Sequence, residues 1–363
     1  MRKTVPLKLR AMPHEYNIAV TDEAPFASLV GRVRSMSWSS LVIVTNTVVD
    51  RLYGKAIGAA FRRGNLRYES IVLPDGERHK SLDTIQKIYG RLLSYNADRD
   101  SVLIGIGGGV IGDITGFAAS TYMRGVRYVQ VPTTLLAQVD AAIGGKTAVD
   151  YSFVKNIVGT FHQPAFVYSN INLLGTLPAR IYRAGIAETI KYGVVKDRRL
   201  FLYIESHKDD ILNRTPGTLL SIVYGSSRIK ALFVEEDEKE TSGARALLNF
   251  GHTFAHAIES STHYRVLHGE AVGLGMIMAA RLSHLLGLCQ SDVPERVEQT
   301  VKGFKLPASL DNIGMQDLSK SIDYDKKGRA DKINLILLSD IGRPMTYRMD
   351  KKELKKILTE VKI

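Results

Sequence analysis

The stretch GIGGGVIGDITGFAASTYMR, Gly105–Arg124, decides how the first half of the chain is interpreted. It continues an apolar run, Ser101–Ile106, that is typical of a buried strand. The chain then passes through Gly107–Gly109, and we expect it to enter a helix near Gly112. A strand, a glycine turn and a helix in this order let backbone N–H groups approach a pyrophosphate at the helix N-terminus. The stretch therefore predicts a dinucleotide-binding turn or, as the alternative, a glycine-rich turn that packs a helix on a sheet.

The glycine spacing alone is a weak signal. Gly107, Gly109 and Gly112 satisfy the pattern GxGxxG. Asp113, however, sits inside the first helical turn, which the usual fingerprint lacks. No acidic residue closes the next expected strand, Tyr128–Pro132, where dinucleotide-binding folds place the partner of the ribose. The function must therefore be inferred from the rest of the chain as well.

Alternating strand and helix patterns surround this stretch. We expect strands at Tyr16–Val20, Leu41–Thr45, Tyr68–Leu73, Tyr128–Pro132 and Ala165–Asn170, and helices at Val49–Arg62 and Ser81–Tyr95. This alternation is typical of an open, mostly parallel sheet with helices on both faces. Ligands of such sheets bind at the carboxyl ends of the strands, which is where the polar and glycine positions fall.

The pattern changes in the second half of the chain. Leu135–Phe161 shows no clear period and is expected to be loop-like. After Pro178 long helical patterns dominate, and only Asp331–Leu338 and Met345–Arg348 are strand-like. We therefore predict an α/β, Rossmann-like N-terminal domain over residues 1–177 and a mainly α-helical C-terminal domain over residues 178–363.

Bulk composition limits the class of protein. With 363 residues, 45% of them hydrophobic and 24% charged, the chain has an ordinary globular composition. Its one cysteine, Cys289, excludes an internal disulfide framework and favours a reducing compartment, so we expect a cytoplasmic protein. The N-terminus lacks a continuous apolar core, so no secretory signal is expected. The most apolar long window, Gly269–Leu288, contains charged residues and predicts a buried helix, so no membrane partner is expected.

The net charge is +12, but the Lys and Arg residues are scattered along the chain. No basic run is interleaved with exposed aromatic residues, so we expect no nucleic-acid partner. A solvated basic surface and a preference for anionic small molecules account for the charge instead.

Three segments of the second half contain side chains that bind metals. Glu188 lies in GIAETIKYG, His252 and His256 lie in NFGHTFAH, and His268 lies in LHGE. His252 and His256 share a helix face, but Thr253 stands where the HExxH motif needs Glu, so a zincin is not expected. One carboxylate and two imidazoles with an open position suit a catalytic Zn²⁺. The alternative, histidines that are hydrogen-bonded core or cap residues, stays open on these residues alone.

A second group of candidates is cationic. Lys and Arg side chains, combined with amide donors, hold phosphates and carboxylates in proteins. The candidates are Lys146, Lys155, Lys191, Lys230, Arg245, one of Lys326 and Lys327, and the amides Asn156 and Asn249. Each one alone is equally compatible with a solvated surface charge, so their value depends on convergence in space.

Six segments together resemble 3-dehydroquinate synthase, of the sugar-phosphate cyclase superfamily. They are GGGVIGDITGFAASTYMRG, VPTTLLAQVDAAIGGKTAVD, KNIVGTFHQP, GIAETIKYG, RALLNFGHTFAHAIE and LHGEAVGLGM, in that family's order and spacing, within a match over Thr45–Ile341. The resemblance implies conversion of 3-deoxy-D-arabino-heptulosonate 7-phosphate into 3-dehydroquinate and phosphate in the shikimate pathway. It also implies bound NAD, a divalent metal, Zn²⁺ or Co²⁺, a site between the two domains, and a homodimer.

The resemblance assigns roles to individual residues. It implies the metal ligands Glu188, His252 and His268. Around NAD it implies Asn46, Asp75, Glu77, Lys80, Gly108, Gly109, Val110, Asp113, Thr133, Thr134, Lys146, Lys155, Leu173 and Thr176. Around the substrate it implies Asp140, Lys146, Asn156, Lys191, Lys230, Glu240, Arg245, Asn249, His256 and, of the paired lysines, Lys326.

Three positions need separate statements. Asn46 stands where many members of the family carry Asp, which leaves its contact with the ribose open. The chain is one residue longer than many relatives around Thr241–Gly243, which leaves the place of Glu240 open. We expect Arg124 to end the helix that begins at the glycine turn, about 16 Å beyond Asp113 at ~1.5 Å per residue. The resemblance implies that this Arg reaches the substrate phosphate of the neighbouring subunit.

Three other functions compete with this interpretation. Sister cyclases, 2-deoxy-scyllo-inosose synthase and 2-epi-5-epi-valiolone synthase, bind substrates without the carboxylate, whereas Arg245 with Asn249 and Asn156 favours a substrate that has one. A metal-dependent polyol dehydrogenase of related fold would release NADH. A non-catalytic module that kept the fold would be expected to have lost its metal ligands, and all three are present.

Overall fold

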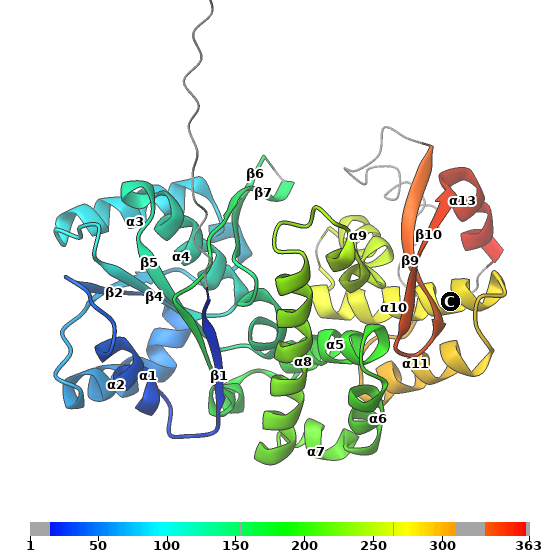
Figure 1. The fold of residues 1–363 in the computed structure, drawn as a ribbon, viewed down its shortest axis with the longest axis horizontal. Helices are drawn as coiled ribbons and strands as arrows, with labels where there is room; N and C mark the ends of the chain where they lie inside the picture. Colours follow the sequence, from blue (N-terminus) through cyan, green and yellow to red (C-terminus); the bar gives the residue numbers. More distant parts are fainter. Residues whose placement is uncertain (1–14, 153, 264, 310–330, 361–363) are drawn as a thin grey trace, which may run out of the picture.

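The first half of the chain is built on a six-stranded parallel sheet (Figure 1). The computed structural model describes residues 15–152, 154–263, 265–309 and 331–360. The strand order is β1-β8-β5-β4-β2-β3. The strands are β1 Asn17–Thr21, β2 Leu41–Asn46, β3 Glu69–Leu73, β4 Val102–Gly107, β5 Arg127–Pro132 and β8 Phe166–Asn170. The predicted open parallel sheet is confirmed, with strand ends that differ from the expected ones by at most one residue.

Helices cover both faces of this sheet. They are α1 Ala27–Arg34 and α2 Thr47–Arg63 on one face, and α3 Leu82–Ser94 and α4 Gly109–Thr121 on the other. Successive side chains of a strand point to opposite faces. Leu41 and Ile43 therefore pack with α1 and α2, whereas Val42 and Val44 pack with α3 and α4. This double burial explains why the central strands are continuous apolar runs.

The turn from β4 into α4 depends on its glycines. A Cβ on Gly107 would lie 2.6 Å from Cβ of Ile111, and a Cβ on Gly112 would lie 2.6 Å from Oε1 of Gln130 on β5. Glycine therefore lets α4 lie close against the sheet. The helix begins at Gly109 and not near Gly112 as predicted. The low helix propensity of glycine concealed the first turn.

The prediction of a loop-like Leu135–Phe161 is wrong. A single π-helical turn, Ala137–Ala141, is followed by the antiparallel hairpin β6 Lys146–Tyr151 and β7 Val154–Phe161. The hairpin buries Val149 against the α3 and α4 face of the sheet. A register shift between Val149 and Tyr151 interrupts the alternation of the two strands, which explains why no period of two was visible.

The prediction that Arg124 ends the α-helix is also wrong. The α-helix α4 ends at Thr121, and a short 3₁₀ turn, Tyr122–Arg124, follows it. Met123 and Arg124 have φ angles of 48° and 66°, so the chain reverses direction here before it enters β5. The helical length estimate from Asp113 to Arg124 therefore does not apply.

The second half of the chain is mainly helical, as predicted. Its helices are α5 Ala179–Val195, α6 Arg198–Ser206, α7 Lys208–Leu212, α8 Pro216–Glu236, α9 His252–Ser261, α10 His268–Leu285, α11 Asp292–Gly303 and α13 Lys351–Glu360. An antiparallel pair, β9 Lys332–Asp340 and β10 Arg343–Asp350, packs against them. α10 is almost entirely buried, which confirms the buried helix expected from the apolar window.

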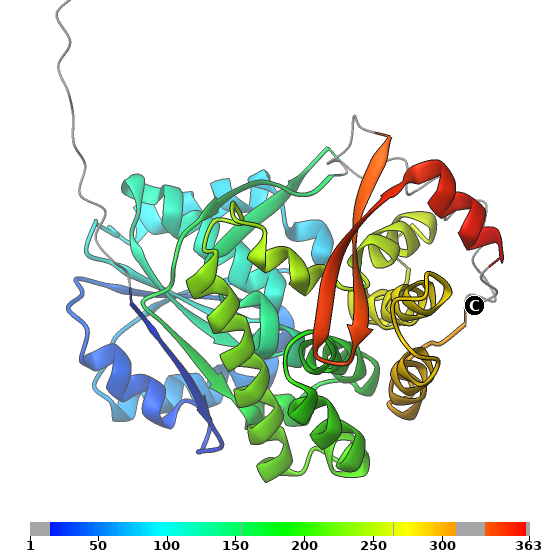
Figure 2. The same cartoon turned by 45° about the vertical axis from the view of Figure 1, so that its right-hand side comes forward.

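The two halves contact each other along α8, which lies beside β1 and the turn Ala137–Ala141 (Figure 2). Among the described residues, no helix is both long enough and apolar enough to cross a membrane. The domain boundary near Leu177 falls between the last strand of the sheet, β8, and the first long helix, α5, and stays a prediction.

Candidate active site

The three predicted metal ligands meet at one point of the helical half. Glu188 lies on α5, and His252 and His268 are the first residues of α9 and α10. One ligand atom from each lies within 4.8 Å of the others. Nε2 of His252 lies 3.4 Å, and Nε2 of His268 3.3 Å, from Oε1 of Glu188. The arrangement is a carboxylate with two imidazoles, the donor set of a catalytic divalent metal.

Close glycine contacts bring the three helices together. A Cβ on Gly275 of α10 would lie 2.1 Å from the carbonyl oxygen of Gly251, which precedes α9. A Cβ on Gly269 of α10 would lie 1.8 Å from the carbonyl oxygen of Ala184 on α5. Gly251 itself has a φ of 78°, which favours glycine. The glycines beside the two histidines therefore determine how closely the ligands approach each other.

The electrostatics of Glu188 fit a bound cation. Its carboxylate is fully buried, and neither oxygen has a well-formed hydrogen bond in the described part of the chain, although Nζ of Lys191 lies 2.5 Å from Oε2. Burial alone would raise the pKa of Glu188, but Lys191, His252 and His268 hold that pKa well below its usual value. A buried anion without hydrogen bonds is costly unless a cation offsets it. A divalent metal between Oε1 and the two imidazoles fits this position.

The histidines differ in charge. Burial and Lys191 lower the pKa of His252, which keeps its ring neutral and available as a ligand. Burial also acts to lower the pKa of His268, but the nearby carboxylates of Glu188 and Glu259 raise it to about 10. The raised pKa reflects the negative charge around this ring, which also attracts a metal cation.

Glu259 is a residue that the sequence reasoning missed. Its Oε1 lies 3.4 Å from Nδ1 of His268 and 3.9 Å from Nζ of Lys155. A carboxylate behind a ligating imidazole fixes the ring orientation in many metal sites. A signal was present, because His252, His256 and Glu259 recur at helical spacing and share one face of α9.

A buried acid organises the cations next to this centre. Asp140 accepts a hydrogen bond from Nζ of Lys230 and another from the hydroxyl of Tyr192, both at 2.5 Å. Burial alone would raise the pKa of Asp140, but Lys230 and Lys191 lower it below its usual value. Since Lys191 also contacts Glu188, the cationic cluster is continuous with the metal centre.

A second cluster joins the two halves of the molecule. Lys146 of β6 forms an ion pair with Glu240, and Oε1 of Glu240 lies 3.3 Å from Nε of Arg245. Arg245 is only 2% exposed; its Nη1 donates to the carbonyl oxygen of Glu238 at 2.9 Å. Its Nη2 is buried without a hydrogen-bond partner among the described residues. An unpaired N–H of a buried guanidinium is a position where an anionic ligand is expected. Glu240 reaches this cluster despite the longer loop.

The predicted cofactor residues lie at the carboxyl edge of the sheet. Asn46 accepts a hydrogen bond from the backbone N–H of Val49 at 2.8 Å and so caps α2. Its Nδ2 donates to Oδ1 of Asp75 at 2.6 Å. A neutral amide at position 46 therefore pairs with Asp75, where two carboxylates would repel each other.

Lys80 connects three predicted residues at this edge. Its buried Nζ lies 2.5 Å from Oδ2 of Asp113 and also donates to Oδ1 of Asn156 on β7. Burial raises the pKa of Asp113 to about 6, against the opposing effect of Lys80. Lys155, next along β7, lies 3.9 Å from Oε1 of Glu77 in the short helix Glu77–His79. The hairpin thus brings its lysine and amide to the cofactor edge.

The remaining cofactor candidates surround the glycine turn. The N–H of Thr133 donates to the carbonyl oxygen of Gly107 at 2.9 Å, and a Cβ on Gly108 would lie 3.1 Å from Thr134. Gly109 and Val110 form the first turn of α4. Leu173 and Thr176, in the 3₁₀ helix Ile171–Thr176, are held by the hydroxyl of Tyr53 at 3.1 and 2.7 Å.

The last four predicted site residues are Arg124, Asn249, His256 and Lys326. Asn249 and His256 are exposed, and the ring of His256 lies 5.7 Å from that of His252. Arg124 is exposed, and in the described part of the chain no ion pair or hydrogen bond ties its side chain to another predicted site residue. Lys326 lies outside the described residues.

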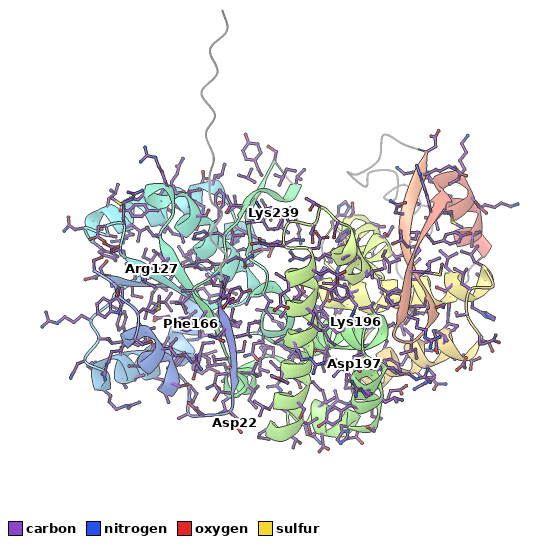
Figure 3. All side chains as sticks on the ribbon, viewed as in Figure 1. Asp22, Arg127, Phe166, Lys196, Asp197 and Lys239 are labelled. Atoms are coloured by element: carbon purple, nitrogen blue, oxygen red, sulfur yellow. The ribbon has the colours of Figure 1, made fainter. Side chains whose placement is uncertain are left out.

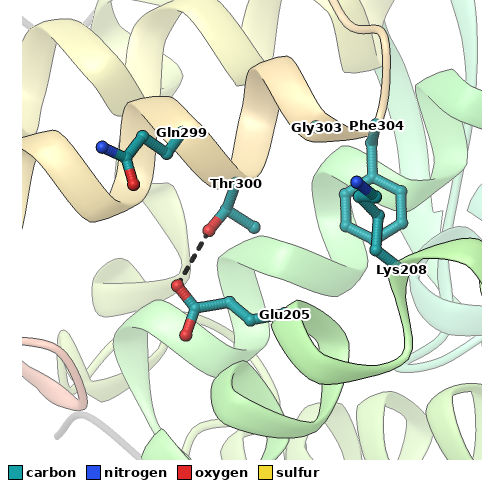
Figure 4. Close-up of a pocket in the computed structure, with 6 residues that line it drawn as sticks. All are labelled: Glu205, Lys208, Gln299, Thr300, Gly303 and Phe304. Carbon is teal, nitrogen blue, oxygen red and sulfur yellow. Dashed lines mark hydrogen bonds between the residues drawn. The ribbon is translucent and has the colours of Figure 1, made fainter.

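Two surface hollows lie away from these residues. One, of about 200 Å³, is lined by Glu205, Lys208, Gln299, Thr300, Gly303 and Phe304, with Thr300 donating to Glu205 at 3.2 Å (Figure 4). The other, of about 300 Å³, lies near Lys196 and Arg228. Neither contains a predicted site residue, so the site is placed by the converging side chains and not by the shape of the surface.

Fold and site together define the class: a two-part protein with a candidate dinucleotide-binding sheet and a candidate metal site. A parallel sheet with a glycine turn at its carboxyl edge faces a helical half that carries a carboxylate and two imidazoles. Comparison with known families shows to which family within this class the chain belongs. The family description "3-dehydroquinate synthase N-terminal" matches residues 70–184, and "3-dehydroquinate synthase C-terminal" matches residues 185–328. The chain belongs to the 3-dehydroquinate synthase family, which confirms the resemblance found in its motifs.

Individual relatives agree with this assignment. The chain is 43% identical over 317 residues to a 3-dehydroquinate synthase of Acetivibrio thermocellus, covering 87% of this chain and 88% of the relative. It is 41% identical over 358 residues to one of Thermodesulfovibrio yellowstonii, covering 97% and 99%. Among solved structures, it is similar to 2-epi-5-epi-valiolone synthase from Streptomyces hygroscopicus subsp. jinggangensis 5008 with NAD⁺ and Zn²⁺ bound. That similarity has a TM-score of 0.87 at 26% identity, over 98% of this chain and 99% of the other.

A more distant likeness supports the fold alone. A 2-deoxy-scyllo-inosose synthase complexed with carbaglucose-6-phosphate, NAD⁺ and Co²⁺ has a TM-score of 0.82 at 24% identity, over 92% of this chain and 94% of the other. The predicted combination of a Rossmann-like sheet and a helical half is therefore the fold of this solved structure as well.

Proposed function

We propose that this chain is a carbon–oxygen lyase that converts 3-deoxy-D-arabino-heptulosonate 7-phosphate into 3-dehydroquinate and phosphate. One observation carries the proposal. The Glu188, His252 and His268 triad adjoins a cationic cluster around Asp140, in a chain 43% and 41% identical to relatives of that name. A metal next to several cations suits a substrate with a hydroxyl to be activated and anionic ends to be held.

Two groups from solution complete this site. We assign the divalent metal, Zn²⁺ or Co²⁺, to Glu188, His252 and His268, and NAD to the carboxyl edge of the sheet around Gly108 and Lys80. When bound, NAD accepts and returns a hydride, and the metal polarises the oxygen of the carbon being oxidised. The buried and unsatisfied carboxylate of Glu188 supports the metal assignment. The close approach that Gly107, Gly108 and Gly112 allow supports the cofactor assignment.

The protein side chains bind and orient the substrate. Arg245 presents a buried guanidinium with a free N–H, which suits a planar carboxylate. Lys146 and Lys230 neutralise charge on the phosphate that leaves. Burial lowers the pKa of both lysines, although Glu240 and Asp140 oppose this effect. Asp140 orients Lys230. Cations at both anionic ends would hold the substrate in one conformer, which favours the intramolecular aldol reaction that closes the carbocycle of 3-dehydroquinate.

We further propose a homodimer. The hydroxyl of Thr160 on β7 donates to that of Ser120 at 2.8 Å, so the hairpin and the end of α4 form one surface. Apolar side chains are exposed there: Met123, Tyr151, Ile157 and Phe161. Arg124 lies next to Met123 and would reach the substrate phosphate in the partner. Exposed apolar patches of this kind mark contact surfaces.

Location and domain limits complete the proposal. The single cysteine, Cys289, is free and buried, which fits a reducing compartment, and we place the enzyme in the cytoplasm. We place the domain boundary near Leu177, with the α/β domain before it and the metal-binding domain after it.

The test is phosphate release from 3-deoxy-D-arabino-heptulosonate 7-phosphate by the purified protein. We expect release that stops with a chelator, returns with Zn²⁺, and leaves no net NADH, because the cofactor is regenerated in each turnover. NADH that accumulates in step with substrate loss would show a polyol dehydrogenase instead. The likeness to 2-epi-5-epi-valiolone synthase favours a sister cyclase as the second candidate. Equal rates with an uncarboxylated heptulose phosphate would support that candidate.

A further inference from the structure

The loop Asp237–Arg245, which follows α8 and includes the first two residues of the 3₁₀ helix Ala244–Asn249, carries two of the site residues, Glu240 and Arg245. The backbone before that helix is irregular. Glu240 has a φ of 56° and Gly243 a φ of 87°. A left-handed conformation at a non-glycine residue is unfavourable and persists only where the surroundings enforce it. Something in the fold must therefore hold this loop in shape.

The carboxylate of Asp237 is the group that holds it. Its Oδ1 accepts the backbone N–H groups of Thr241 at 2.7 Å and Ser242 at 3.1 Å. Its Oδ2 accepts those of Gly243 at 3.1 Å and Arg245 at 3.4 Å. Asp237 is buried and directly follows Glu236, the last residue of α8, so one side chain at the end of a helix binds four backbone donors. Consecutive N–H groups that converge on an anion form a stable concave turn.

The held loop determines where the site residues lie. From it, Glu240 reaches Lys146 across the two halves, and the guanidinium of Arg245 enters the space next to Gly144. A Cβ on Gly144 would lie 2.7 Å from Nη2 of Arg245, so there is little room for the guanidinium to move. A small shift of the loop would therefore misplace the buried Nη2 of Arg245, which has no hydrogen-bond partner among the described residues.

We propose that Asp237 is a positioning residue, whose carboxylate closes the loop Asp237–Arg245 and so places Arg245 and Glu240 for the substrate. This inference rests on the proposed function for the identity of the substrate. The closed loop itself does not depend on that function. The loop also contains Thr241–Gly243, where the resemblance implies one extra residue, and the carboxylate of Asp237 binds the backbone of all three residues in that stretch.

The direct test is Asp237→Asn, which keeps the shape of the side chain. The amide oxygen can still accept two N–H groups, but the NH₂ group faces the other two donors and repels them. We expect kcat/KM for phosphate release to fall by about 10²-fold, chiefly through KM, because a misplaced contact to the substrate is costly. Bound zinc should stay at the wild-type value, and the melting temperature should fall by only a few degrees, so that the variant stays folded in the assay. The matched control is Asp197→Asn, which removes a carboxylate that accepts the N–H groups of Arg199 and Leu200 at α6, and which should keep wild-type kcat/KM.

A measurement that needs no substrate distinguishes a failure of the Asp237 proposal from a failure of the proposed function. Lys239 is exposed on this loop, apart from Asp197 on the helical half (Figure 3). Cleavage by trypsin after Lys239 should be several-fold faster in Asp237→Asn than in the wild-type protein or Asp197→Asn. The cleavage rate reports how firmly the loop is held, even if the wild-type protein releases no phosphate.

A second variant reaches the same loop from its other side. Gly243→Ala has open space for its Cβ but strains a backbone with positive φ, so it should raise KM and speed cleavage after Lys239. Gly287→Ala is the matched control, since Gly287 also has a positive φ and open space but lies between α10 and α11. Wild-type KM and wild-type cleavage in Asp237→Asn would overturn the proposal. The proposal would also be overturned if loss of bound zinc, or unfolding at the assay temperature, accounted for the whole loss of activity.

Discussion

Glu259 shows how much of a metal site depends on a residue that binds no metal. Its carboxylate lies 3.4 Å from Nδ1 of His268, on the side of the ring away from Glu188. Removal of such a partner typically weakens metal binding by about 10–100-fold. We therefore expect Glu259→Ala to raise the zinc dissociation constant within that range, and Glu259→Gln to have a smaller effect.

The measurement is competition for zinc with a chromophoric chelator, which needs no substrate. Glu298→Gln is a suitable control, because Glu298 is paired with Arg281 and Lys302 on the surface and lies outside the site. An unchanged zinc affinity in Glu259→Ala, at an unchanged melting temperature, would show that the ring of His268 is oriented by other contacts.

The sequence predicted which residues belong to the candidate site better than it predicted the contacts that position them. Glu188, His252 and His268 could be predicted because they are metal-ligand types in motifs that resemble a known family, and the two histidines also stand beside glycines. Glu259 and Asp237 could not, because their roles arise from helix packing and from a loop shape that no local period describes.

Gly116 determines how α4 and the hairpin β6–β7 fit together. A Cβ at this position would lie 2.3 Å from Cγ2 of Thr147 on β6 and 3.1 Å from the ring of Tyr128. Thr147 cannot move easily, because it is buried and its hydroxyl donates to the carbonyl oxygen of Thr160 at 3.1 Å. We expect Gly116→Ala to lower the free energy of unfolding by about 1–3 kcal/mol through overpacking.

Gly90→Ala is the matched control in α3, where a Cβ meets no atom within 4 Å. That change should raise the free energy of unfolding by about 0.4–1 kcal/mol, because alanine restricts the unfolded chain. Both values are measured by urea unfolding of the protein without ligands. Equal effects of the two substitutions would mean that the hairpin adjusts freely to α4.

The elements that the sequence predicted well are those with an undisturbed period. The central strands are buried on both faces and the helices α2 and α3 are amphipathic, so local patterns were sufficient. The hairpin was missed because the register shift near Tyr151 breaks the alternation. The position of β1 beside β8 could not be read either, since this pairing joins strands far apart in the chain.

On the scale of the whole molecule, the site is assembled from both halves. Lys146 pairs with Glu240 and Lys155 lies near Glu259, so the hairpin of the first half contacts the metal-binding half. A chain whose halves were misplaced would keep the metal triad, which lies within one half, but would lose these contacts between the halves. We expect a second subunit to complete the site in the same way, because Arg124 has no described contact with the predicted site residues of its own chain.

Arg124 therefore allows a test of the proposed dimer. It lies in a turn with a φ of 66°, exposed next to Met123, and it is not tied by an ion pair or hydrogen bond to the predicted site residues of its own chain in the described part. If it acts on the partner's substrate, Arg124→Ala and Glu188→Ala should each be inactive alone. In a mixed dimer, one site combines an intact metal triad with the partner's intact Arg124. Because a two-fold dimer has two sites, activity should return to about half the wild-type rate per mixed dimer. The rate is measured after subunit exchange between the two purified variants, with each variant exchanged against itself as the control. If Arg124 acts within its own chain, both sites of the mixed dimer stay damaged and no activity returns.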